Sequence, residues 1–508
     1  MTYFDKDLSL ELGNAYRHLK QVGCLRSKQN DTWAKMLKGT GRILTDSRLV
    51  KTGDIFVAYQ GLETDSHKFI PGVLSKKPGL IIAENCTGLD NSSEDVPILF
   101  CENSRQAWAY LCALACGNPQ DKLQSLAITG TNGKTSSLWI LKSLFESHQI
   151  PYLTIGTLGI YINGQHYPSQ HTTPDPPMLY LSLKKAVDLG VTVMAMEASS
   201  HSIVQEKLAP IRFSCAAWTS FSQDHLDFHE TMEAYWKVKW SLFTHYLQTR
   251  GRAILNTSLD PSPPVEALAE NEVITYGQGS KDSKVDLRLS QAVNGKHGSQ
   301  IELSYKGSQY RYQIPFWGVY NLENFLCALA MFETIDGKFP EASKTIELSG
   351  IPGRLQKVQT KSENKPCVLI DYAHTPDALE KAIDAIKPDC KGKVIVVFGC
   401  GGDRDHDKRS KMGAIAEAHA HKVILTSDNP RSESPKKIID EIKTGFLKSQ
   451  PVMIEDRKSA IFWSISNAHK DDFVLIAGKG HESYQIIGSK VFEFDDYKIA
   501  KSALEAEK

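Results

Sequence analysis

The residues whose types and spacing most clearly indicate chemistry run from Thr129 to Ser137 and read TGTNGKTSS. They follow the short apolar run 126–128 and precede a segment, SLWILKSLFESH, that is typical of a helix. A glycine-rich turn between a strand and a helix binds phosphate through its backbone N–H groups, and the positive end of the helix dipole strengthens the attraction. Lys134 is expected to reach the β- and γ-phosphates, and the Thr135 hydroxyl a Mg²⁺ ion.

This phosphate-binding loop is a shortened variant of the common P-loop pattern. The common pattern has a further glycine five residues before Gly133, where this chain has Ile128. An ordinary Gly/Ser/Thr loop is the alternative interpretation, and the strand–loop–helix context argues against it. We therefore predict that the chain binds ATP. The predicted contacts from this loop are Gly130, Thr131, Asn132, Gly133, Lys134, Thr135 and Ser136.

Two further segments follow apolar runs and are candidates for metal binding. The apolar run 191–196 is followed directly by Glu197, and an acid at the carboxyl end of a buried strand lies where α/β sheets bind ligands. Glu197 would hold Mg²⁺ directly or through water, and the alternative is a surface glutamate at a strand end. The segment 221–229, FSQDHLDFH, contains His225. Its Asp and His residues fit a metal site, a general base or an ordinary polar loop.

Lys239 lies on a predicted helix within the motif YWKVKW, which Leu242 and Phe243 extend with an apolar face. One interpretation is that the lysine stem lies along apolar surface while the ammonium stays in water. The other is a chemically reactive lysine, whose amine must be partly neutral, as burial promotes. The residues by themselves leave both interpretations open.

Three polar loops follow apolar runs in the last third of the chain: GCGGDR at 399–404, TSDNPR at 426–431 and AGKGHE at 477–482. The first loop lacks the dinucleotide-binding spacing because Arg404 occupies the third glycine position. An anion-binding turn with an arginine beside it fits better. Together the loops would form a pocket with cationic and anionic groups, which suits a zwitterionic substrate. Ordinary solvated loop tips are the alternative.

The elements that position these residues alternate between strand-like and helix-like runs, which favours an α/β fold. In the middle of the chain the predicted strands are 151–155, 191–196, 215–221 and 252–256, followed by a helix around 323–334. Residues 285–315 instead alternate apolar and polar side chains, as antiparallel strands do. Further strands are predicted at 54–58, 80–83 and 96–100, and at 367–370, 394–398, 422–425 and 473–477.

We predict three domains. Residues 1–122 form a smaller α/β domain, 123–348 a central P-loop-type domain, and 349–508 a Rossmann-like domain. The central sheet is expected to be mainly parallel with helices on both faces, and a Gly/Pro-rich break at 349–353 marks the second boundary.

The composition excludes several function classes. The 508 residues include 59 basic and 59 acidic side chains, and no block of like charge indicates nucleic acid or an anionic membrane surface. No apolar stretch approaches the roughly 20 residues of a membrane span, and the N-terminal residues do not read as a signal peptide. Ten cysteines without CxxC pairs predict buried free thiols, and the 16 histidines lack zinc-site spacing. We expect a cytoplasmic monomer.

Taken in order from about Leu44, the chain resembles the Mur ligase family, the ATP-dependent enzymes that build the peptidoglycan stem peptide. The resemblance rests on the motifs TGTNGKT, MEASSH, SQDHLDFH, GVYNLEN, IPGRLQ, DYAHTPDAL, GCGGDRD, SDNPRSESP and AGKGHE, and on the helix lysine. It implies an N-terminal domain for the UDP end of the substrate, a central domain for ATP, and a C-terminal domain that carries the incoming amino acid and closes over the site.

The resemblance also implies roles for individual residues. Thr135, Glu197, His225 and Lys239 would bind Mg²⁺, with Lys239 carbamylated (N6-carboxylysine), and Lys134, Glu197, His225 and Lys239 would be catalytic. The implied nucleotide contacts outside the P-loop are Asn321, Arg354, Asp371 and His374. The implied UDP-sugar-peptide contacts are Ser47, Arg48, Thr172, Thr173, Ser199, Gln205 and Lys207, although Lys207 stands where relatives often carry arginine. The implied amino-acid contacts are Arg404, Asp428, Asn429, Arg431, Gly478 and Glu482.

The reaction implied by the resemblance is addition of meso-diaminopimelate to UDP-MurNAc-L-Ala-D-Glu. Asp-Asn-Pro-Arg is the form seen in diaminopimelate-adding relatives, and the Arg431 guanidinium would bind the distal carboxylate of diaminopimelate and repel the ammonium of lysine. The alternatives are an L-lysine-adding or dipeptide-adding relative, a folylpolyglutamate synthase, and a catalytically inactive ATP-binding scaffold. The segment TDSRLVKTGDIFVAYQG and the DNPR loop argue against the other enzymes, and the joint presence of Lys134, Glu197, His225 and Lys239 against the scaffold.

Overall fold

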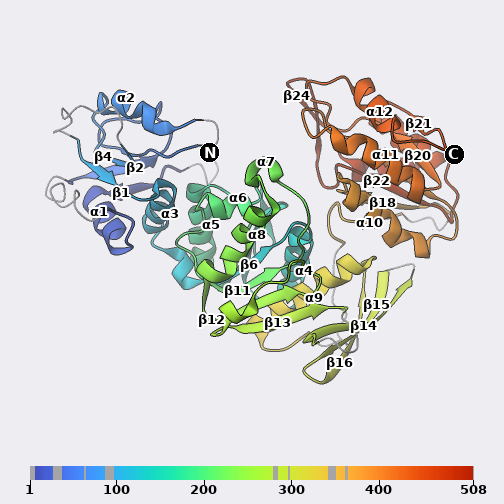
Figure 1. Cartoon of the computed structure of the whole chain (residues 1–508), viewed down its shortest axis with the longest axis horizontal. Coiled ribbons are helices and arrows are strands. Elements are labelled where there is room, and N and C mark those ends of the chain that lie inside the picture. Colours follow the sequence, from blue (N-terminus) through green and yellow to red (C-terminus); the bar gives the residue numbers. More distant parts are fainter. Residues whose placement is uncertain are drawn as a thin grey trace. The chain divides into compact units, whose positions relative to one another are not determined.

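The computed structural model describes residues 6–26, 37–61, 64–85, 96–278, 284–295, 298–340, 350–360 and 364–506. The chain forms two compact units. Unit 1 comprises residues 1–276 and 327–339, and unit 2 comprises residues 277–326 and 340–508. Figure 1 shows both units coloured along the chain, with many of their helices and strands labelled.

The first sheet of unit 1 has five strands and packs against three helices. The strands are β1 (Ser9–Glu11), β2 (Thr40–Leu44), β3 (Ile55–Val57), β4 (Leu80–Ala83) and β5 (Ile98–Phe100), and the helices are α1 (Leu12–Gln21), α2 (Ile70–Leu74) and α3 (Ser104–Ala115). The strands lie in chain order, with β1 antiparallel to β2 and the other neighbours parallel. Because successive side chains point to opposite faces, Ile55 and Val57 pack with α1 and α3, whereas Phe56 packs with α2. The three predicted strands of this region are confirmed.

The second sheet of unit 1 contains the strand that precedes the phosphate-binding loop. Its strands are β6 (Gln124–Thr129), β7 (Tyr152–Gly156), β8 (Gly159–Ile162), β9 (Gln165–Tyr167), β10 (Val193–Glu197), β11 (Phe213–Trp218), β12 (Leu247–Asn256) and β13 (Glu272–Gly277). They follow the order β13-β12-β11-β6-β10-β7-β8-β9 and are parallel as far as β7. The helices of this region are α4 (Lys134–Ser147), α5 (Pro176–Asp188), α6 (Ser200–Val204), α7 (Leu226–His229) and α8 (Met232–Ser241). The prediction of a mainly parallel sheet is confirmed.

The register of this sheet brings three strand ends together. Glu197 of β10 pairs with Ile128 of β6, and Trp218 of β11 pairs with Thr129. Because the carboxyl ends of parallel strands meet at one edge of the sheet, the loop after Thr129, the Glu197 side chain and the segment after β11 lie next to one another.

Unit 2 contains an antiparallel meander and the start of a long helix. The meander consists of β14 (Leu287–Gly295), β15 (Gly298–Tyr305) and β16 (Ser308–Ile314), and the helix is α9 (Val319–Asp336). These elements confirm the antiparallel strands predicted within 285–315 and the helix predicted around 323–334.

The remaining part of unit 2 is a three-layer α/β fold. Its strands are β17 (Gln356–Lys357), β18 (Cys367–Asp371), β19 (Val394–Phe398), β20 (Lys422–Leu425), β21 (Val452–Met453) and β22 (Phe473–Ala477), in the order β17-β18-β22-β19-β20-β21. Helices α10 (Pro376–Ile386), α11 (Asp407–His419) and α12 (Pro435–Lys443) pack on one face, and α13 (Arg457–Ser466) and α14 (Asp496–Glu505) on the other. Only β17 is antiparallel to its neighbour, and a separate hairpin joins β23 (Tyr484–Ile487) to β24 (Lys490–Glu493). The four strands predicted here are confirmed.

The predicted domain boundaries stay predictions. The first falls between residues 122 and 123, just before β6 begins at Gln124. The second falls at 348–349, within residues 341–349, which lie outside the described residues.

The described residues agree with the expected cysteine state. Nine of the ten cysteines fall in them, all nine are free thiols, and only Cys367 and Cys390 are not fully buried. Within the same residues, no helix has both the length and the apolar character to cross a bilayer.

A buried ion pair joins the C-terminal helix to the sheet of unit 2. The side chains of Arg457 on α13 and Asp496 on α14 are both 0% exposed and form two hydrogen bonds, Nε to Oδ1 at 2.9 Å and Nη2 to Oδ2 at 2.6 Å. Arg457 Nη2 also donates to the carbonyl of Ala477 at the end of β22, at 2.9 Å. The guanidinium therefore anchors a loop that follows this strand.

Removing one partner of this pair should destabilise unit 2 strongly. In Asp496→Ala the Arg457 guanidinium stays buried without its counter-ion, so we expect the free energy of unfolding to fall by about 3–5 kcal/mol. Native-state hydrogen exchange of the β18–β22 amides measures this loss. The control is Asp377→Ala, which removes an exposed i,i+4 pair with Lys381 and should cost about 0.3–0.5 kcal/mol. Equal losses in the two variants would contradict the analysis.

Candidate functional site

The side chain of Lys134 folds back onto the phosphate-binding loop. Helix α4 begins at Lys134 directly after Gly133, whose φ of +88° belongs to the left-handed region. Lys134 Nζ donates to the carbonyl oxygens of Gly130, at 2.7 Å, and Thr131, at 2.9 Å. Gly130 has a φ of +150°, and a Cβ there would collide with Thr219 Oγ1. The loop conformation therefore requires glycine at this position.

The segment after β11 supports the same loop. The Asn132 backbone N–H donates to Ser220 Oγ at 2.9 Å, and Thr219 Oγ1 donates to the Asn132 carbonyl at 2.5 Å. Ser136 lies one residue further along α4 than Thr135 and is buried. These bonds hold the loop in a fixed turn directly before the N-terminus of α4, the position at which proteins bind phosphate.

Glu197 is fully buried at the end of β10 and accepts three hydrogen bonds. The donors are Thr135 Oγ1 at 3.1 Å, the Thr157 backbone N–H at 2.8 Å and Thr157 Oγ1 at 3.1 Å. No lysine or arginine of the described residues forms an ion pair with it. A buried carboxylate next to a hydroxyl offers the hard oxygen ligands that Mg²⁺ prefers. Glu197 and Thr135 therefore fit the predicted metal site.

Lys239 is buried on α8 and points to the phosphate-binding loop. Its side chain is 1% exposed, its Nζ donates to the Gly130 carbonyl at 2.8 Å, and it lies 4.5 Å from the centre of the Tyr235 ring. Burial, and next the positive charge of Lys134, hold the pKa of Lys239 well below its usual range. Of the two interpretations left open by the sequence, the structure supports the neutral, reactive amine and excludes a lysine that extends into water.

His225 is the most exposed member of the predicted catalytic set, with 42% of its side chain accessible. It adopts a φ of +53° just before α7, and its ring lies 4.8 Å from that of His201 and 6.1 Å from that of Tyr235. The Tyr235 hydroxyl in turn forms a hydrogen bond of 3.3 Å with the Thr131 hydroxyl of the loop. His225 therefore belongs to the same neighbourhood as the loop.

The residues predicted to bind the UDP-sugar peptide fall into two groups in unit 1. Thr172 Oγ1 contacts Thr157 Oγ1 at 3.1 Å, and Thr173 Oγ1 donates to the Glu197 carbonyl at 3.0 Å. Lys207 Nζ donates to the Thr173 carbonyl at 3.3 Å and pairs with Asp175 at 2.8 Å. These contacts place Thr172, Thr173 and Lys207 beside the P-loop edge of the sheet.

The other residues predicted to bind the UDP-sugar peptide are more dispersed. Ser199 caps α6 by accepting from the Ser202 backbone N–H at 3.1 Å, and Gln205 ends the same helix. Ser47 and Arg48 follow β2 in the first sheet, where the guanidinium of Arg48 is 87% exposed and pairs with Asp46 at 2.7 Å. Within the described residues, no contact joins Ser47 or Arg48 to the P-loop group.

Four predicted nucleotide-binding residues lie in unit 2. Asp371, at the end of β18, accepts from the Leu355 backbone N–H at 2.7 Å and the Ala373 N–H at 2.8 Å, and burial raises its pKa. The Arg354 guanidinium lies 4.4 Å from the centre of the Tyr372 ring. His374 contacts the Tyr372 carbonyl through Nδ1 at 2.8 Å, and burial lowers its pKa. Asn321 lies on α9 and donates to the Trp317 carbonyl at 3.0 Å. Arg354, Asp371 and His374 thus lie around Tyr372 at the end of β18, and Asn321 lies on a separate helix.

The predicted amino-acid contacts converge at the carboxyl ends of β19, β20 and β22. A Cβ on Gly401 would lie 3.0 Å from Arg431 Nη1 and 3.7 Å from Arg404 Cγ, so the two arginines flank one glycine. Gly478 has a φ of +110°, and a Cβ there would lie 2.6 Å from Asp428 Oδ2. The structure therefore brings guanidinium and carboxylate groups together at this edge of the sheet.

The backbone around Arg431 is held by the β23–β24 hairpin. Arg431 has a φ of +51°, its N–H donates to the Ile486 carbonyl at 3.1 Å, and its carbonyl accepts from the Gly488 N–H at 2.7 Å. Gln485 Nε2 donates to the Asp428 carbonyl at 2.7 Å, and Arg431 Nη1 donates to the Gly402 carbonyl at 2.8 Å. A left-handed conformation is uncommon for arginine, and these bonds compensate for its cost.

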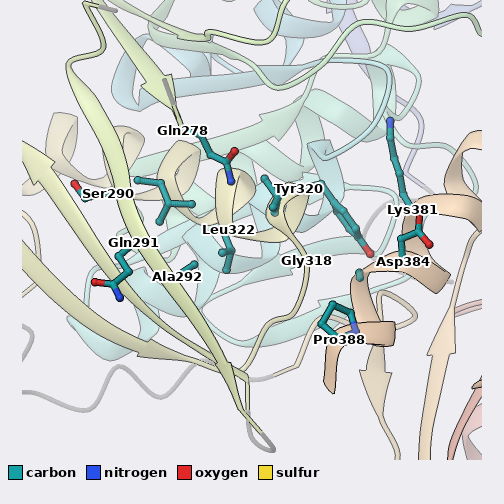
Figure 2. A pocket seen from close by; sticks show the side chains of 13 residues that line it. Gln278, Ser290, Gln291, Ala292, Gly318, Tyr320, Leu322, Lys381, Asp384 and Pro388 are labelled. Atoms are coloured by element: carbon teal, nitrogen blue, oxygen red, sulfur yellow. The ribbon is translucent and has the colours of Figure 1, made fainter. Parts of the chain in front are cut away.

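Two other features of unit 2 are separate from the predicted sites. A pocket of about 650 Å³ is lined by β14, the start of α9 and α10, and includes Gln291, Tyr320 and Lys381 (Figure 2). None of the predicted site residues lines it. Glu380, Asp384 and His419 form the one His/Cys/Asp/Glu cluster among the described residues with metal-binding geometry, but their ion pairs account for it. It has no connection with the predicted Mg²⁺ ligands.

Sequence reasoning missed several residues that shape the site. Thr157 donates twice to Glu197, and Thr219 supports the phosphate-binding loop. Gln485 is tied to the DNPR loop. None of the three lies in a segment whose pattern indicates chemistry, so only their spatial position identifies them. Lys479 belongs to the AGKGHE motif, but the sequence pattern assigns it no role.

The fold and the site define a class: α/β proteins that combine a P-loop on one parallel sheet with a second α/β sheet whose strand-end loops carry charged side chains. Within that class the chain belongs to the Mur ligase family. The family model for the Mur ligase middle domain matches residues 128–332, and the model for the Mur ligase glutamate ligase domain matches residues 353–480. The chain is therefore an ATP-dependent ligase of the family that forms peptide bonds in peptidoglycan precursor synthesis.

Relatives and solved structures agree with this assignment. The chain is 36% identical over 464 residues to UDP-N-acetylmuramoyl-L-alanyl-D-glutamate–2,6-diaminopimelate ligase of Coxiella burnetii, covering 91% of this chain and 94% of the relative. It is 36% identical over 461 residues, with the same coverage, to the ligase of that name from Clostridium tetani. A solved structure of such a ligase matches with a TM-score of 0.66, 31% identity, and coverage of 91% and 94%. MurF ligase from Thermotoga maritima in complex with ADP shares the fold, with a TM-score of 0.61, 19% identity, and coverage of 92% and 98%.

Adding one methyl group to the phosphate-binding loop should abolish nucleotide binding. In Gly130→Ala the new Cβ collides with Thr219 Oγ1 and the residue is held at an unfavourable φ, so the loop must rearrange. We expect the affinity for ATP to fall at least about 100-fold, equivalent to roughly 2.7 kcal/mol, in a calorimetric titration. Gly72→Ala is the control, because a Cβ there meets nothing within 4 Å. Wild-type affinity in Gly130→Ala would show that the loop does not bind the phosphates.

Proposed function

We propose that this chain adds meso-2,6-diaminopimelate to UDP-N-acetylmuramoyl-L-alanyl-D-glutamate, using ATP with Mg²⁺ and releasing the tripeptide product, ADP and phosphate. The names of relatives that match over 91% of the chain support this choice over an L-lysine-adding ligase. The proposed cytoplasmic location comes from the composition, and the monomer is proposed as the default state.

The observation that carries the proposal is that guanidinium and carboxylate groups lie together at the carboxyl ends of β19, β20 and β22. Arg404 and Arg431 flank Gly401, and Asp428 and Glu482 lie on the adjoining loops. Diaminopimelate has two carboxylates and two ammonium groups, whereas L-lysine has only one carboxylate. A second planar guanidinium, which binds a carboxylate through two parallel hydrogen bonds, is therefore useful for diaminopimelate and unfavourable for the ammonium of lysine.

The first step of the proposed reaction is activation of a carboxylate. The side-chain carboxylate of the D-glutamyl residue attacks the γ-phosphorus of ATP, and the bond between that phosphorus and the oxygen of ADP breaks. The acyl phosphate that forms carries a good leaving group. Lys134 and the backbone N–H groups after Gly130 neutralise and position the transferred phosphoryl group, as phosphoryl transfer requires.

The second step forms the amide bond. A neutral amine of diaminopimelate attacks the acyl carbon, the bond to the phosphate oxygen breaks, and the nitrogen loses a proton. Arg404 and Arg431 orient the amino acid by its carboxylates, and Asp428 and Glu482 receive its ammonium group. This orientation determines which amine reaches the acyl carbon.

Glu197, Thr135, His225 and a carbamylated Lys239 are the groups proposed to hold Mg²⁺. The bound ion would supply positive charge to the phosphoryl oxygens. Lys239 fits this role only after modification, because an ammonium repels a cation whereas a carbamate offers anionic oxygens. Its burial and lowered pKa favour the neutral amine that reacts with carbon dioxide.

Phosphate release with a panel of amino acids tests the proposed specificity. With ATP, Mg²⁺ and UDP-MurNAc-L-Ala-D-Glu, we expect meso-diaminopimelate to support release and L-lysine to support almost none. In Arg431→Ala the KM for diaminopimelate should rise roughly 10- to 100-fold, because a charge-assisted bidentate contact is lost. Equal activity with L-lysine in the wild-type enzyme would refute the proposed substrate.

The matched control for this experiment is Arg311→Ala. Arg311 lies on β16 of the same unit, its side chain is 82% exposed, and it pairs only with Glu302 at the surface. Its removal should leave the KM values for all three substrates unchanged. An unchanged KM in Arg431→Ala would remove the basis for selecting diaminopimelate.

Chemical rescue tests the carbamate. Lys239→Ala removes the proposed metal-binding oxygens, so activity should fall roughly 100-fold or more and recover in part with short carboxylic acids such as acetate. Lys237→Ala is the control, because Lys237 lies on the same helix but is 69% exposed and paired with Glu233. Full activity of Lys239→Ala without any additive would exclude a carbamate role.

A further inference from the structure

One buried lysine beside the predicted amino-acid contacts of unit 2 has no role in the proposed reaction. The Lys479 side chain is 0% exposed, and its Nζ donates to Asn429 Oδ1 at 3.1 Å and to Glu482 Oε2 at 3.2 Å. The ring of Tyr484 lies with its centre 5.5 Å from the ammonium. Taking an ammonium out of water costs several kcal/mol unless ionic and hydrogen-bonding partners compensate. Both of its side-chain partners are predicted amino-acid contacts.

The ammonium determines how the Asn429 amide is oriented. Lys479 has only donors, so it must face the amide oxygen rather than the NH₂ group. Asn429 Oδ1 also accepts from the Ile486 backbone N–H at 3.0 Å, and Nδ2 donates to Glu482 Oε2 at 2.9 Å. Every polar neighbour of this amide therefore agrees with one orientation.

The same contacts select the orientation of Glu482. Its Oε2 atom accepts from both Lys479 and Asn429, whereas Oε1 receives no hydrogen bond from the described part of the chain. The Glu482 side chain is 18% exposed. One carboxylate oxygen is thus held by the protein, and the other is left for an ammonium group of a ligand.

We propose that Lys479 is a positioning residue for the amino-acid substrate. It holds Asn429 and Glu482 in the orientation that receives an ammonium group of the incoming amino acid, and it compensates part of the negative charge of Glu482. This inference rests on the proposed function, because it assumes that the loops carrying Asn429 and Glu482 bind the amino acid.

The test is Lys479→Met, which keeps an unbranched side chain of similar length and removes the charge. In the phosphate-release assay we expect the KM for meso-diaminopimelate to rise about 10- to 100-fold, the range for losing charge-assisted hydrogen bonds. The KM values for ATP and the UDP-linked dipeptide should stay within about twofold of wild type, because neither site includes this residue. Lys479→Gln keeps one donor for Asn429 without the charge, so it should restore part of the affinity and also serves if Lys479→Met does not fold.

Three outcomes would overturn the proposal. The first is an unchanged KM for diaminopimelate in a folded Lys479→Met or Lys479→Gln variant. The second is an equal loss for all three substrates together with a lowered melting temperature, which indicates a purely structural lysine. The third is a Lys479→Met effect that adds fully to that of Glu482→Gln, since a residue acting through Glu482 must be non-additive with it.

A control variant and the activity of the wild-type enzyme distinguish failure of this inference from failure of the proposed function. Lys381→Met removes an exposed lysine of the same unit, paired with Asp377, and should leave all three KM values unchanged. If wild-type enzyme releases no phosphate with diaminopimelate, the proposed function fails and, with it, the assumption behind this inference. If wild-type enzyme is active and the Lys479 variants match it, only the role of Lys479 is refuted.

Discussion

Two lysine side chains donate to one carbonyl oxygen at the centre of unit 1. Lys134 and Lys239 both reach the carbonyl of Gly130, at 2.7 Å and 2.8 Å. Two ammonium groups that share one acceptor repel each other, and the repulsion is greatest where water is excluded. Burial, and next the positive charge of Lys134, relieve the conflict because they favour the neutral amine at Lys239. The conformation of one glycine therefore links the phosphate-binding loop to the lysine proposed to be carbamylated.

This arrangement depends on the parallel register of the sheet. Pairing of Glu197 with Ile128 and of Trp218 with Thr129 places three strand ends in one row. A slip of one residue would turn the Glu197 carboxylate to the opposite face of the sheet, away from Thr135. The apolar side chains of β6, β10 and β11 are buried on both faces and hold the register. The chemistry at the edge is thus positioned by the packing of the interior.

Unit 2 organises its charged loops in a different way. Its loops at the ends of β20 and β22 are tied to buried charges: Arg457 holds the carbonyl of Ala477, and Lys479 holds Asn429 and Glu482. A hairpin adds backbone hydrogen bonds on both sides of Arg431. Buried ion pairs contribute little net stability compared with apolar packing, but they define geometry closely. These buried charges therefore fix the positions of the charged loops more than they stabilise the fold.

The sequence by itself determined the alternation of strands and helices, the P-loop and the candidate residues Glu197, Lys134 and Arg431. These depend on local patterns: apolar periodicity, glycine spacing and polar residues at strand ends. Only the tertiary structure decided that Lys239 is buried against Gly130, 109 residues away, and that Thr157 donates to Glu197, 40 residues away. It also decided that Lys479 faces Asn429. The physical reason is that burial and hydrogen-bond partners come from residues distant in the chain, whose approach is set by how the sheets pack rather than by any local pattern.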